Sequence, residues 1–156
     1  METITLLLAL PIFWALLFSF FGESLARGSK VTGPVIAGSY WLLSAFLITS
    51  VVAGDSHYLN VVWVPSLGMD FNFRLESFHL WFAALICFIG GCIQLYATCY
   101  FAGKKELRRL LLYLQVFTLA MLGVVASENL YTLFLFWELT SVGSFLLVGL
   151  HHAVAE

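Results

Sequence analysis

The chain has 156 residues, of which 62% are hydrophobic and only 10% are charged. Soluble domains carry about 25% charged residues, so this composition excludes an ordinary soluble enzyme or binding module. The mean hydropathy of +0.97 agrees, and the sequence predicts an integral membrane protein. The net charge of −2 says little about partners, because the position of charges along a membrane chain matters more than their sum. No basic stripe extends beyond one short loop, so we expect no nucleic-acid partner.

Five segments are long and apolar enough to cross a bilayer as helices, which takes roughly 20 residues each. In chain order they are Ile4 to Phe21, about Gly33 to Ala53, about Phe78 to Phe101, about Leu110 to Ala126, and about Leu130 to Leu150. The first lacks the basic start and small-residue cleavage site of a signal peptide, so we expect it to remain as a helix. The sequence therefore predicts an all-α membrane protein with a single transmembrane region over residues 1–156.

The basic residues predict the orientation of these helices. The loops "GESLARGSKV" and "AGKKELRRL" hold six of the seven Lys and Arg residues, and with five spans these two loops lie on the same side. Loops rich in Lys and Arg stay on the cytoplasmic side of the membrane. The sequence therefore predicts an N-terminus outside and a C-terminus inside.

The segment 55–75, between the second and third helices, predicts a small β-hairpin on the outer face. "MDFNFRL", from Met69 to Leu75, alternates apolar and polar residues at every step, which is the period of a half-buried strand. Before it, "LNVVWV" is β-branched and aromatic, and "PSLG" supplies turn residues between the two runs. An irregular loop is the alternative.

The sequence predicts neither a cofactor nor a metal site. Cys92 and Cys99 lie on one face of the third helix, but about 10 Å apart by helix rise. That is too far for a disulfide bond or a shared metal ion, so we interpret both, with Cys87, as small buried hydrophobes. His151 and His152 follow the last apolar residue and either mark the membrane interface or shuttle protons at the inner mouth.

Glu138 is the candidate functional residue, because it lies near the bilayer midplane within the apolar stretch "FLFWELTSVGSFLLVGL". A charged residue at a helix centre costs about 2.5–3.5 kcal/mol on insertion scales. Such residues face the protein interior or a wet cavity and usually mark ion or proton pathways. A neutral acid hydrogen-bonded to another helix is the alternative.

Other polar residues near this segment could support such a pathway. Ser141 lies on the same face as Glu138, and Thr140, Ser144 and Gly143 permit close helix contact or hold water. Glu128, with Asn129, is expected to cap the start of the fifth helix, where a carboxylate meets the favourable end of the helix dipole. A role for Glu128 at the outer ion entrance is the alternative.

The run "MLGVVASENLYTLFLFWELTSVGSFLLVGL", Met121 to Leu150, resembles helices four and five of the Mrp-type cation/proton antiporter family. The similarity is strongest to the N-terminal portion of the large A subunit, which is related to antiporter-like subunits of respiratory complex I. Upstream, "VPSLGMDFNFRLESFHLWFA" is similar to the outer hairpin and third-helix start of that family. The resemblance thus covers the whole chain.

The resemblance implies a function for Glu138, which matches the fifth-helix glutamate of the family. In that family the glutamate pairs with a lysine on a later, broken helix, and proton movement depends on the pair. No lysine lies inside the five predicted spans here, so we expect a partner chain to supply the remaining helices and a mid-membrane lysine. The implied function is a multi-pass subunit of a sodium/proton antiporter in the cell (inner) membrane.

Two alternatives to this function remain at this stage. The first keeps the fold and makes the chain a proton-pumping subunit of complex I or of a membrane hydrogenase, coupled to redox chemistry elsewhere. The second is a non-transporting scaffold that helps a membrane complex assemble. All three interpretations place the chain in a lipid bilayer among other integral-membrane subunits. The antiporter would transport protons and sodium ions, and the redox-coupled pump would transport protons.

Overall fold

The computed structural model describes residues 2–64, 69–104 and 106–152 and contains five long helices and one β-hairpin. The helices are α1 (Glu2–Arg27), α2 (Ser29–Ala53), α3 (Ser77–Tyr100), α4 (Leu107–Ala126) and α5 (Leu130–His152). The hairpin lies between α2 and α3 and pairs β1 (His57–Val64) with β2 (Met69–Leu75) antiparallel. All five helices are long and apolar enough to cross a membrane, so the chain is a multi-pass membrane protein.

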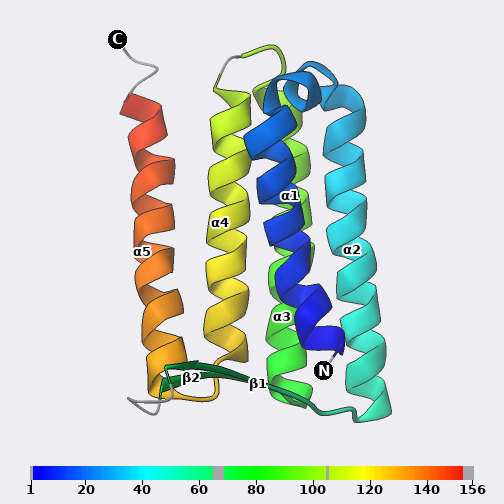
Figure 1. Ribbon diagram of the computed structural model, residues 1–156. Helices are drawn as coiled ribbons and strands as arrows, with labels where there is room; N and C mark the ends of the chain where they lie inside the picture. Colours follow the sequence, from blue (N-terminus) through cyan, green and yellow to red (C-terminus); the bar gives the residue numbers. More distant parts are fainter. Residues whose placement is uncertain (1, 65–68, 105, 153–156) are drawn as a thin grey trace.

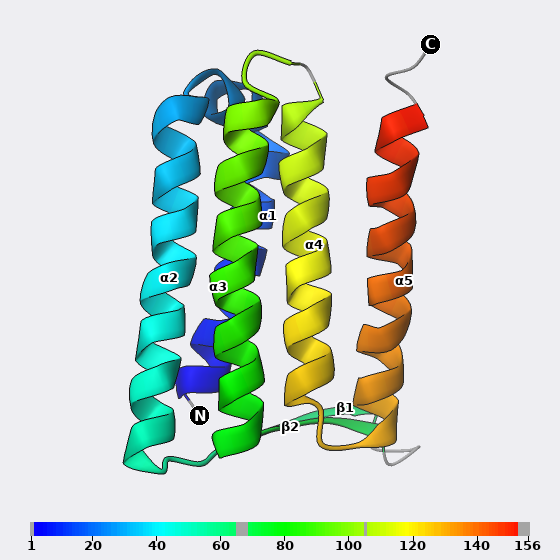
Figure 2. The ribbon, with the colours of Figure 1, turned by 180° about the vertical axis from the view of Figure 1, so that it is seen from behind.

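The helices stand side by side and alternate in direction, and the hairpin crosses one end of the bundle (Figure 1). We call this the hairpin end; it also carries the start of α1. The opposite end, here called the basic end, carries the α1–α2 junction at Gly28 and the loop between α3 and α4. The most extensive packing joins α2 to α3, α1 to α4, and α4 to α5. Seen from behind, α5 stands at the edge of the bundle beside α4 (Figure 2).

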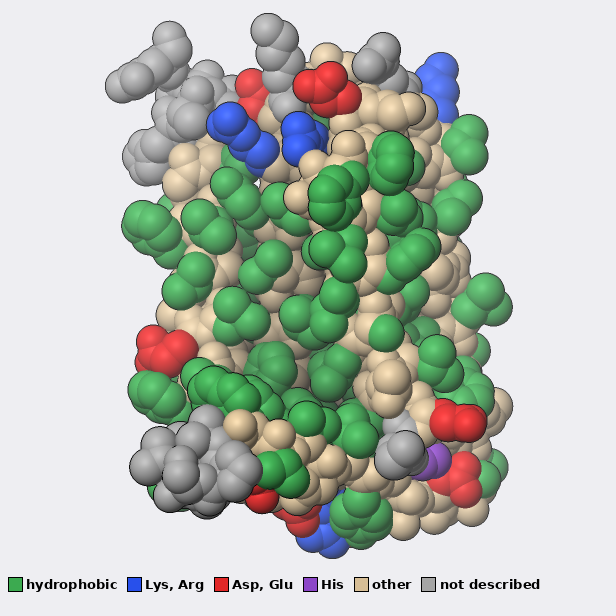
Figure 3. All heavy atoms as spheres, in the orientation of Figure 1, with side chains coloured by type: hydrophobic (Ala, Val, Ile, Leu, Met, Phe, Trp, Pro, Cys, Tyr) green, Lys and Arg blue, Asp and Glu red, His purple; other side chains and the backbone are tan. Residues whose placement is uncertain are grey.

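The surface of the bundle is as apolar as its core. Buried side chains such as Phe18 fill the centre, while Phe20 remains 77% exposed. Cys87 is buried as predicted, but the prediction is wrong for Cys92 and Cys99, which are exposed because they lie on the outer face of α3. Hydrophobic side chains cover the middle of the face in Figure 3, and most charged side chains gather at the two ends, apart from one acidic side chain at the left edge. A helix that is apolar on all sides is expected where the surroundings are hydrocarbon.

Three buried polar side chains link α2, α3 and α4 inside this core. The Tyr40 hydroxyl donates to Gln115 Oε1 over 2.5 Å, and Gln115 Nε2 donates to Gln94 Oε1 over 2.7 Å. Buried polar groups in hydrocarbon must find partners within the protein, so this chain of hydrogen bonds ties three helices together. Thr118 instead donates to the Leu114 carbonyl of its own helix.

The hairpin is anchored to the helices by apolar and backbone contacts. The alternation of β2 places Phe73 and Leu75 in the core, 5% and 0% exposed. Phe73 also forms an isolated bridge with Ser127, and the Glu128 N–H donates to the Asn72 carbonyl over 2.9 Å. The hairpin therefore holds the hairpin-end termini of α4 and α5 in place.

The predicted elements agree with this architecture. The strand prediction is confirmed on both sides of the turn, while the turn residues "PSLG", 65–68, lie outside the described residues. The first helix is longer than its apolar segment, because the polar run after Phe21 continues α1 to Arg27. Placement of the N-terminus on the hairpin side and of both basic loops on the other side follows the predicted pattern. Which end faces the cytoplasm stays a prediction.

A glycine sets the distance between α4 and α5. A Cβ atom on Gly123 would lie 2.1 Å from Cδ1 of Phe136, an overlap no side chain tolerates. We expect Gly123→Ala to force α5 away from α4 and to lower the free energy of unfolding by about 1–3 kcal/mol. Thermal unfolding in mild detergent measures this. Gly38→Ala is the matched control, because nothing lies within 4 Å of its Cβ position.

If the clash is the cause, truncating the ring should relieve it. The double variant Gly123→Ala with Phe136→Ala is expected to lose less stability than the sum of the two single variants. Strict additivity, or a Gly38→Ala variant as unstable as Gly123→Ala, would contradict the packing explanation.

The polar cluster around Arg74 gives the hairpin end a predicted acid sensitivity. Arg74 donates to Glu76 Oε1 from Nε at 2.9 Å, and its Nη1 lies 3.7 Å from Glu128 Oε1. The hydrogen bond from Arg74, and then that from the Tyr58 hydroxyl, holds the pKa of Glu76 below its usual value of 4.5. A lowered carboxyl pKa contributes stability above the unfolded pKa, and this contribution is lost as the pH falls through the folded pKa.

We therefore expect Arg74→Gln to lower the unfolding temperature well above the usual carboxyl pKa of 4.5, with the difference fading as the pH falls through the lowered pKa of Glu76. The measurement is thermal unfolding of parent and variant across this range. Lys30→Gln, at the other end of the bundle, should show no such pH-dependent difference. A difference that persists undiminished at the acid limit would exclude the ion-pair origin.

Candidate functional site

Glu138 lies on the face of α5 that turns away from the rest of the chain. The exposed residues Phe134, Glu138, Ser141, Phe145 and Val148 recur at alternating spacings of four and three, which is one stripe of a helix. Only 6% of the α5 span is buried, against 39% of the α3 and α4 spans. Glu138 is the ninth residue of α5, about 12 Å from its start by helix rise. The structure thus exposes a carboxylate well inside the apolar part of the span.

The opposite face of α5 makes the contact with α4. Gly143 is buried, and its Cβ position lies 3.3 Å from the Phe117 ring, which is close packing. Phe136 packs over Gly123 and lies edge-on to Phe73 of the hairpin, with ring centroids 5.9 Å apart. These contacts fix the rotation of α5 about its axis and so direct Glu138 outward. The predicted close helix contact at Gly143 is confirmed.

The hydroxyl groups near Glu138 bond to their own helix. Thr140 Oγ1 donates to the Trp137 carbonyl over 2.6 Å, and Ser141 Oγ reaches the same carbonyl at 3.5 Å. Ser144 is exposed. Among the described residues, none of these hydroxyls bonds to the Glu138 carboxylate, and no ion pair with it is present. Ser141 shares the Glu138 stripe, whereas Thr140 is partly buried.

The start of α5 is capped as predicted, but by Asn129 rather than by Glu128. Asn129 Oδ1 accepts the Thr132 N–H over 2.8 Å, and Asn129 Nδ2 donates to the Asp70 carbonyl over 2.7 Å. Glu128 instead faces Arg74 of the hairpin. The structure therefore gives Glu128 an attachment between α5 and β2, and a role for it in ion entry stays a prediction.

The remaining candidates lie at the basic end. His151 and His152 are the last residues of α5, and their side chains lie outside the described part of the structure. Lys30 and Lys104 are both at this end, in the first turn of α2 and in the α3–α4 loop. Over the described residues, no group of three or more His, Cys, Asp and Glu side chains could hold a metal ion. Glu138 is thus separated along the bundle from both described lysines.

Reasoning from the sequence missed two polar features that the structure brings together. One is the Tyr40–Gln115–Gln94 chain of hydrogen bonds, and the other is Arg108, whose side chain crosses from α4 to backbone carbonyls of α1. Polar residues inside apolar spans were the available signal for the first. The contact of Arg108 could not be predicted, because it depends on α1 lying beside α4 in the fold.

Comparison with known proteins gives consistent relatives. A family model described as NADH-ubiquinone oxidoreductase (complex I), chain 5 N-terminus, matches residues 62–110. The chain is 36% identical over 153 residues to the A1 subunit of an Na(+)/H(+) antiporter of Staphylococcus haemolyticus (strain JCSC1435), covering 96% of this chain and 19% of that protein. It is also 36% identical over 151 residues to the A/B subunit of a probable K(+)/H(+) antiporter of Rhizobium meliloti (strain 1021), covering 97% and 15% respectively.

A solved structure with a similar fold leads to the same group of proteins. One polypeptide of the Mrp complex from Dietzia sp. DQ12-45-1b superposes with a TM-score of 0.70 and 26% identity, covering 94% of this chain and 16% of that one. The chain therefore spans less than a fifth of the length of these relatives. Over nearly its whole length, the chain is related to the A subunits of Mrp-type cation/proton antiporters and resembles their N-terminal portion.

Proposed function

We propose that the chain forms part of a monovalent cation/proton antiporter of the cell (inner) membrane and that Glu138 carries protons in it. The observation that supports this most directly is a carboxylate on the uncovered stripe of α5, inside the apolar span. Facing lipid, a charge there costs about 2.5–3.5 kcal/mol. Facing further helices and water, the same group can take up and release protons. The uncovered stripe therefore acts as an interface for other transmembrane helices.

The partner of Glu138 in this proposal is a cation on one of those helices. A nearby positive charge favours the ionised carboxylate, while burial favours the protonated form. Because the two described lysines lie at the basic end, the cation must come from outside the described residues. A mid-membrane lysine on a companion segment meets this requirement, with Thr140, Ser141 and Ser144 offering polar positions along α5 for water.

Sodium is the proposed exchanged cation, because relatives from Staphylococcus are named as subunits of Na(+)/H(+) antiporters. The Rhizobium relative is named for K(+)/H(+) exchange and shares the same identity with this chain, which makes potassium the second candidate. The described residues offer no cluster of acidic or histidine ligands that would distinguish the two.

A redox-driven proton pump is the second candidate function. It is favoured by the family model for a complex I chain that matches the hairpin, α3 and the start of α4. Both functions use the same intramembrane carboxylate, so they differ in what accompanies the chain. A scaffold without transport is the third candidate, and it requires Glu138 to be dispensable.

Replacing Glu138 tests whether it carries protons. In everted vesicles that contain the assembled protein, Glu138→Ala and Glu138→Gln should both reduce sodium-dependent proton flux to the level of vesicles lacking it. Glutamine keeps the size and hydrogen bonding of the side chain but cannot titrate, so it separates proton transfer from packing. Running the assay with potassium in place of sodium identifies the cation.

Asp55→Asn is the matched control, because it removes an exposed carboxylate at the hairpin end, beyond the end of α2. This control should retain parental flux. Normal flux in Glu138→Gln vesicles would refute the proposed proton carrier and favour the scaffold. Assembly is checked in parallel from the amount of companion subunits that purify with each variant.

The companions of the chain test the proposed setting of Glu138. We expect purification in mild detergent, followed by mass spectrometry, to recover integral-membrane chains that supply further helices and a lysine within an apolar span. Companions with iron–sulfur or flavin sites would instead establish the redox-driven pump. Recovery of the chain by itself, with α5 unpartnered, would contradict both transport proposals.

A further inference from the structure

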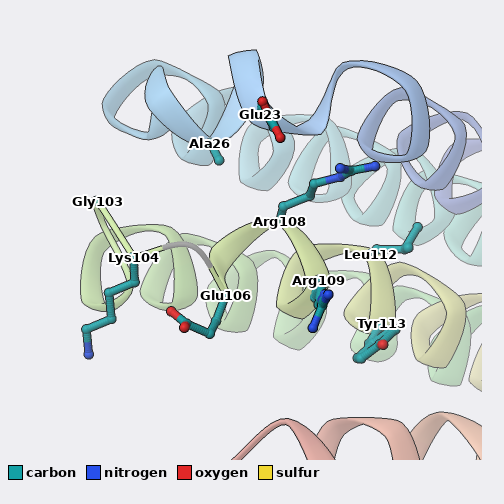
Figure 4. Close-up of a pocket in the computed structure, with 9 residues that line it drawn as sticks. All are labelled: Glu23, Ala26, Gly103, Lys104, Glu106, Arg108, Arg109, Leu112 and Tyr113. Carbon is teal, nitrogen blue, oxygen red and sulfur yellow. The ribbon is translucent and has the colours of Figure 1, made fainter. Parts of the chain in front are cut away.

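An open cavity of about 1040 Å³ lies at the basic end and is lined by residues of α1, the α3–α4 loop and the start of α4 (Figure 4). Six of its lining residues are polar or charged: Glu23, Lys104, Glu106, Arg108, Arg109 and Tyr113. Ala26 and Leu112 provide apolar wall. The cavity is thus lined by three cations and two carboxylates at the depth where the apolar spans end.

Arg108 forms the wall of this cavity toward α1. Its Nε donates to the Phe18 carbonyl over 3.1 Å, and its Nη2 donates to the Ser19 carbonyl over 2.8 Å. Gly22 makes this crossing possible, because a Cβ atom there would lie 2.5 Å from Cγ of Arg108. A guanidinium has five N–H groups, so three remain for another acceptor. The charge is therefore held at a fixed position against α1.

Arg109 and Lys104 provide cations that are more accessible. Arg109 is exposed, and its side chain makes no ion pair with another described residue. Figure 4 shows it beside Tyr113, on the side of α4 that faces α5. Lys104 Nζ lies 5.1 Å and 4.9 Å from the ring centroids of Tyr100 and Phe101. Tyrosine rings such as that of Tyr100 are enriched at the headgroup level of a bilayer.

The start of α4 places like charges together. Its first turn contains no acidic residue but includes Arg108 and Arg109, close to the positive end of the helix dipole. Both the arginine pair and the dipole disfavour further positive charge there. Glu106 at the N-cap and Glu23 of α1 offset part of this charge, and three cations against two carboxylates leave one net positive charge in the lining. A bound anion beside the arginine pair would lower the electrostatic energy there, so this part of the cavity favours anionic ligands.

We propose that this cavity binds the phosphate of an anionic phospholipid from the leaflet at the basic end. Basic cavities between transmembrane helices on one side of the membrane are known to hold such headgroups. On the face in Figure 3, hydrophobic side chains continue from the basic residues toward the hairpin end, which gives the acyl chains an apolar surface. This extended apolar surface favours a lipid over a free phosphate ion.

The test measures how lipids stabilise the purified protein with its companions. Thermal unfolding in mild detergent is followed with phosphatidylglycerol, with phosphatidylcholine of the same acyl chains, or with inorganic phosphate. Phosphatidylglycerol should raise the unfolding temperature most. Its apparent affinity should fall about fivefold for each cation removed in Arg109→Gln and Lys104→Gln. Lys30→Gln, which removes a basic residue at the same end but outside the cavity, should keep parental affinity.

Each other outcome overturns the proposal. Equal stabilisation by phosphatidylcholine would exclude recognition of the anionic headgroup, and an equal loss in Lys30→Gln would show only general attraction to the basic end. Inorganic phosphate that stabilises as well as phosphatidylglycerol would identify a free-anion site instead. If a variant fails to fold by circular dichroism, native mass spectrometry of the parent with the two lipids decides by itself.

Discussion

The absence of water in the hydrocarbon core is the constraint on which this structure depends. Polar groups there must be satisfied by the protein, because lipid offers no hydrogen bonds. Tyr40, Gln115 and Gln94 meet most of this demand by bonding to one another across α2, α4 and α3, although Gln94 Nε2 has no partner among the described residues. Thr98 and Thr118 meet it by donating to carbonyls of their own helices. Within α1 to α4, the polar side chains thus strengthen the bundle.

Glu138 departs from this pattern, and the packing of α5 explains how. Gly143 and Phe136 commit one face of α5 to α4, and the hairpin fixes its start through Asn129 and Glu128. These contacts determine the rotation of the helix and leave the Glu138 stripe outside. A charged carboxylate that faces lipid costs about 2.5–3.5 kcal/mol. Other helices over the stripe would remove this cost, which is why the proposed function includes them.

Features that depend on a short run of sequence could be predicted, whereas features that depend on contacts between helices could not. Helix positions depend on runs of about 20 apolar residues, and the strand containing Phe71 and Phe73 depends on alternation, so both were accessible. The polar run after Phe21 carried no hydropathy signal, so the full length of α1 could not be predicted. Glu138 was evident as an acid in an apolar stretch. The outward direction of the Glu138 side chain could not be predicted, because it depends on how Phe136 packs over Gly123.

The same distinction applies to Arg108. In the sequence it is one of four basic residues in a loop that predicts orientation, and nothing separates it from Arg109. In the structure Arg108 is bound to α1 through Phe18 and Ser19, while Arg109 remains exposed beside the cavity. The position of α1 beside α4 determines that Arg108 has a structural role and that Arg109 stays accessible to a ligand.

The relation to both antiporters and complex I has a physical explanation in these features. A carboxylate on an uncovered helix face and a hairpin that positions this helix are useful to any machine that moves protons through a membrane. Neither feature distinguishes an antiporter subunit from a chain of NADH-ubiquinone oxidoreductase. Among the described residues, no group of three or more His, Cys, Asp and Glu side chains could hold a metal ion. The choice between the two functions therefore depends on the helices and companion chains that cover the α5 stripe.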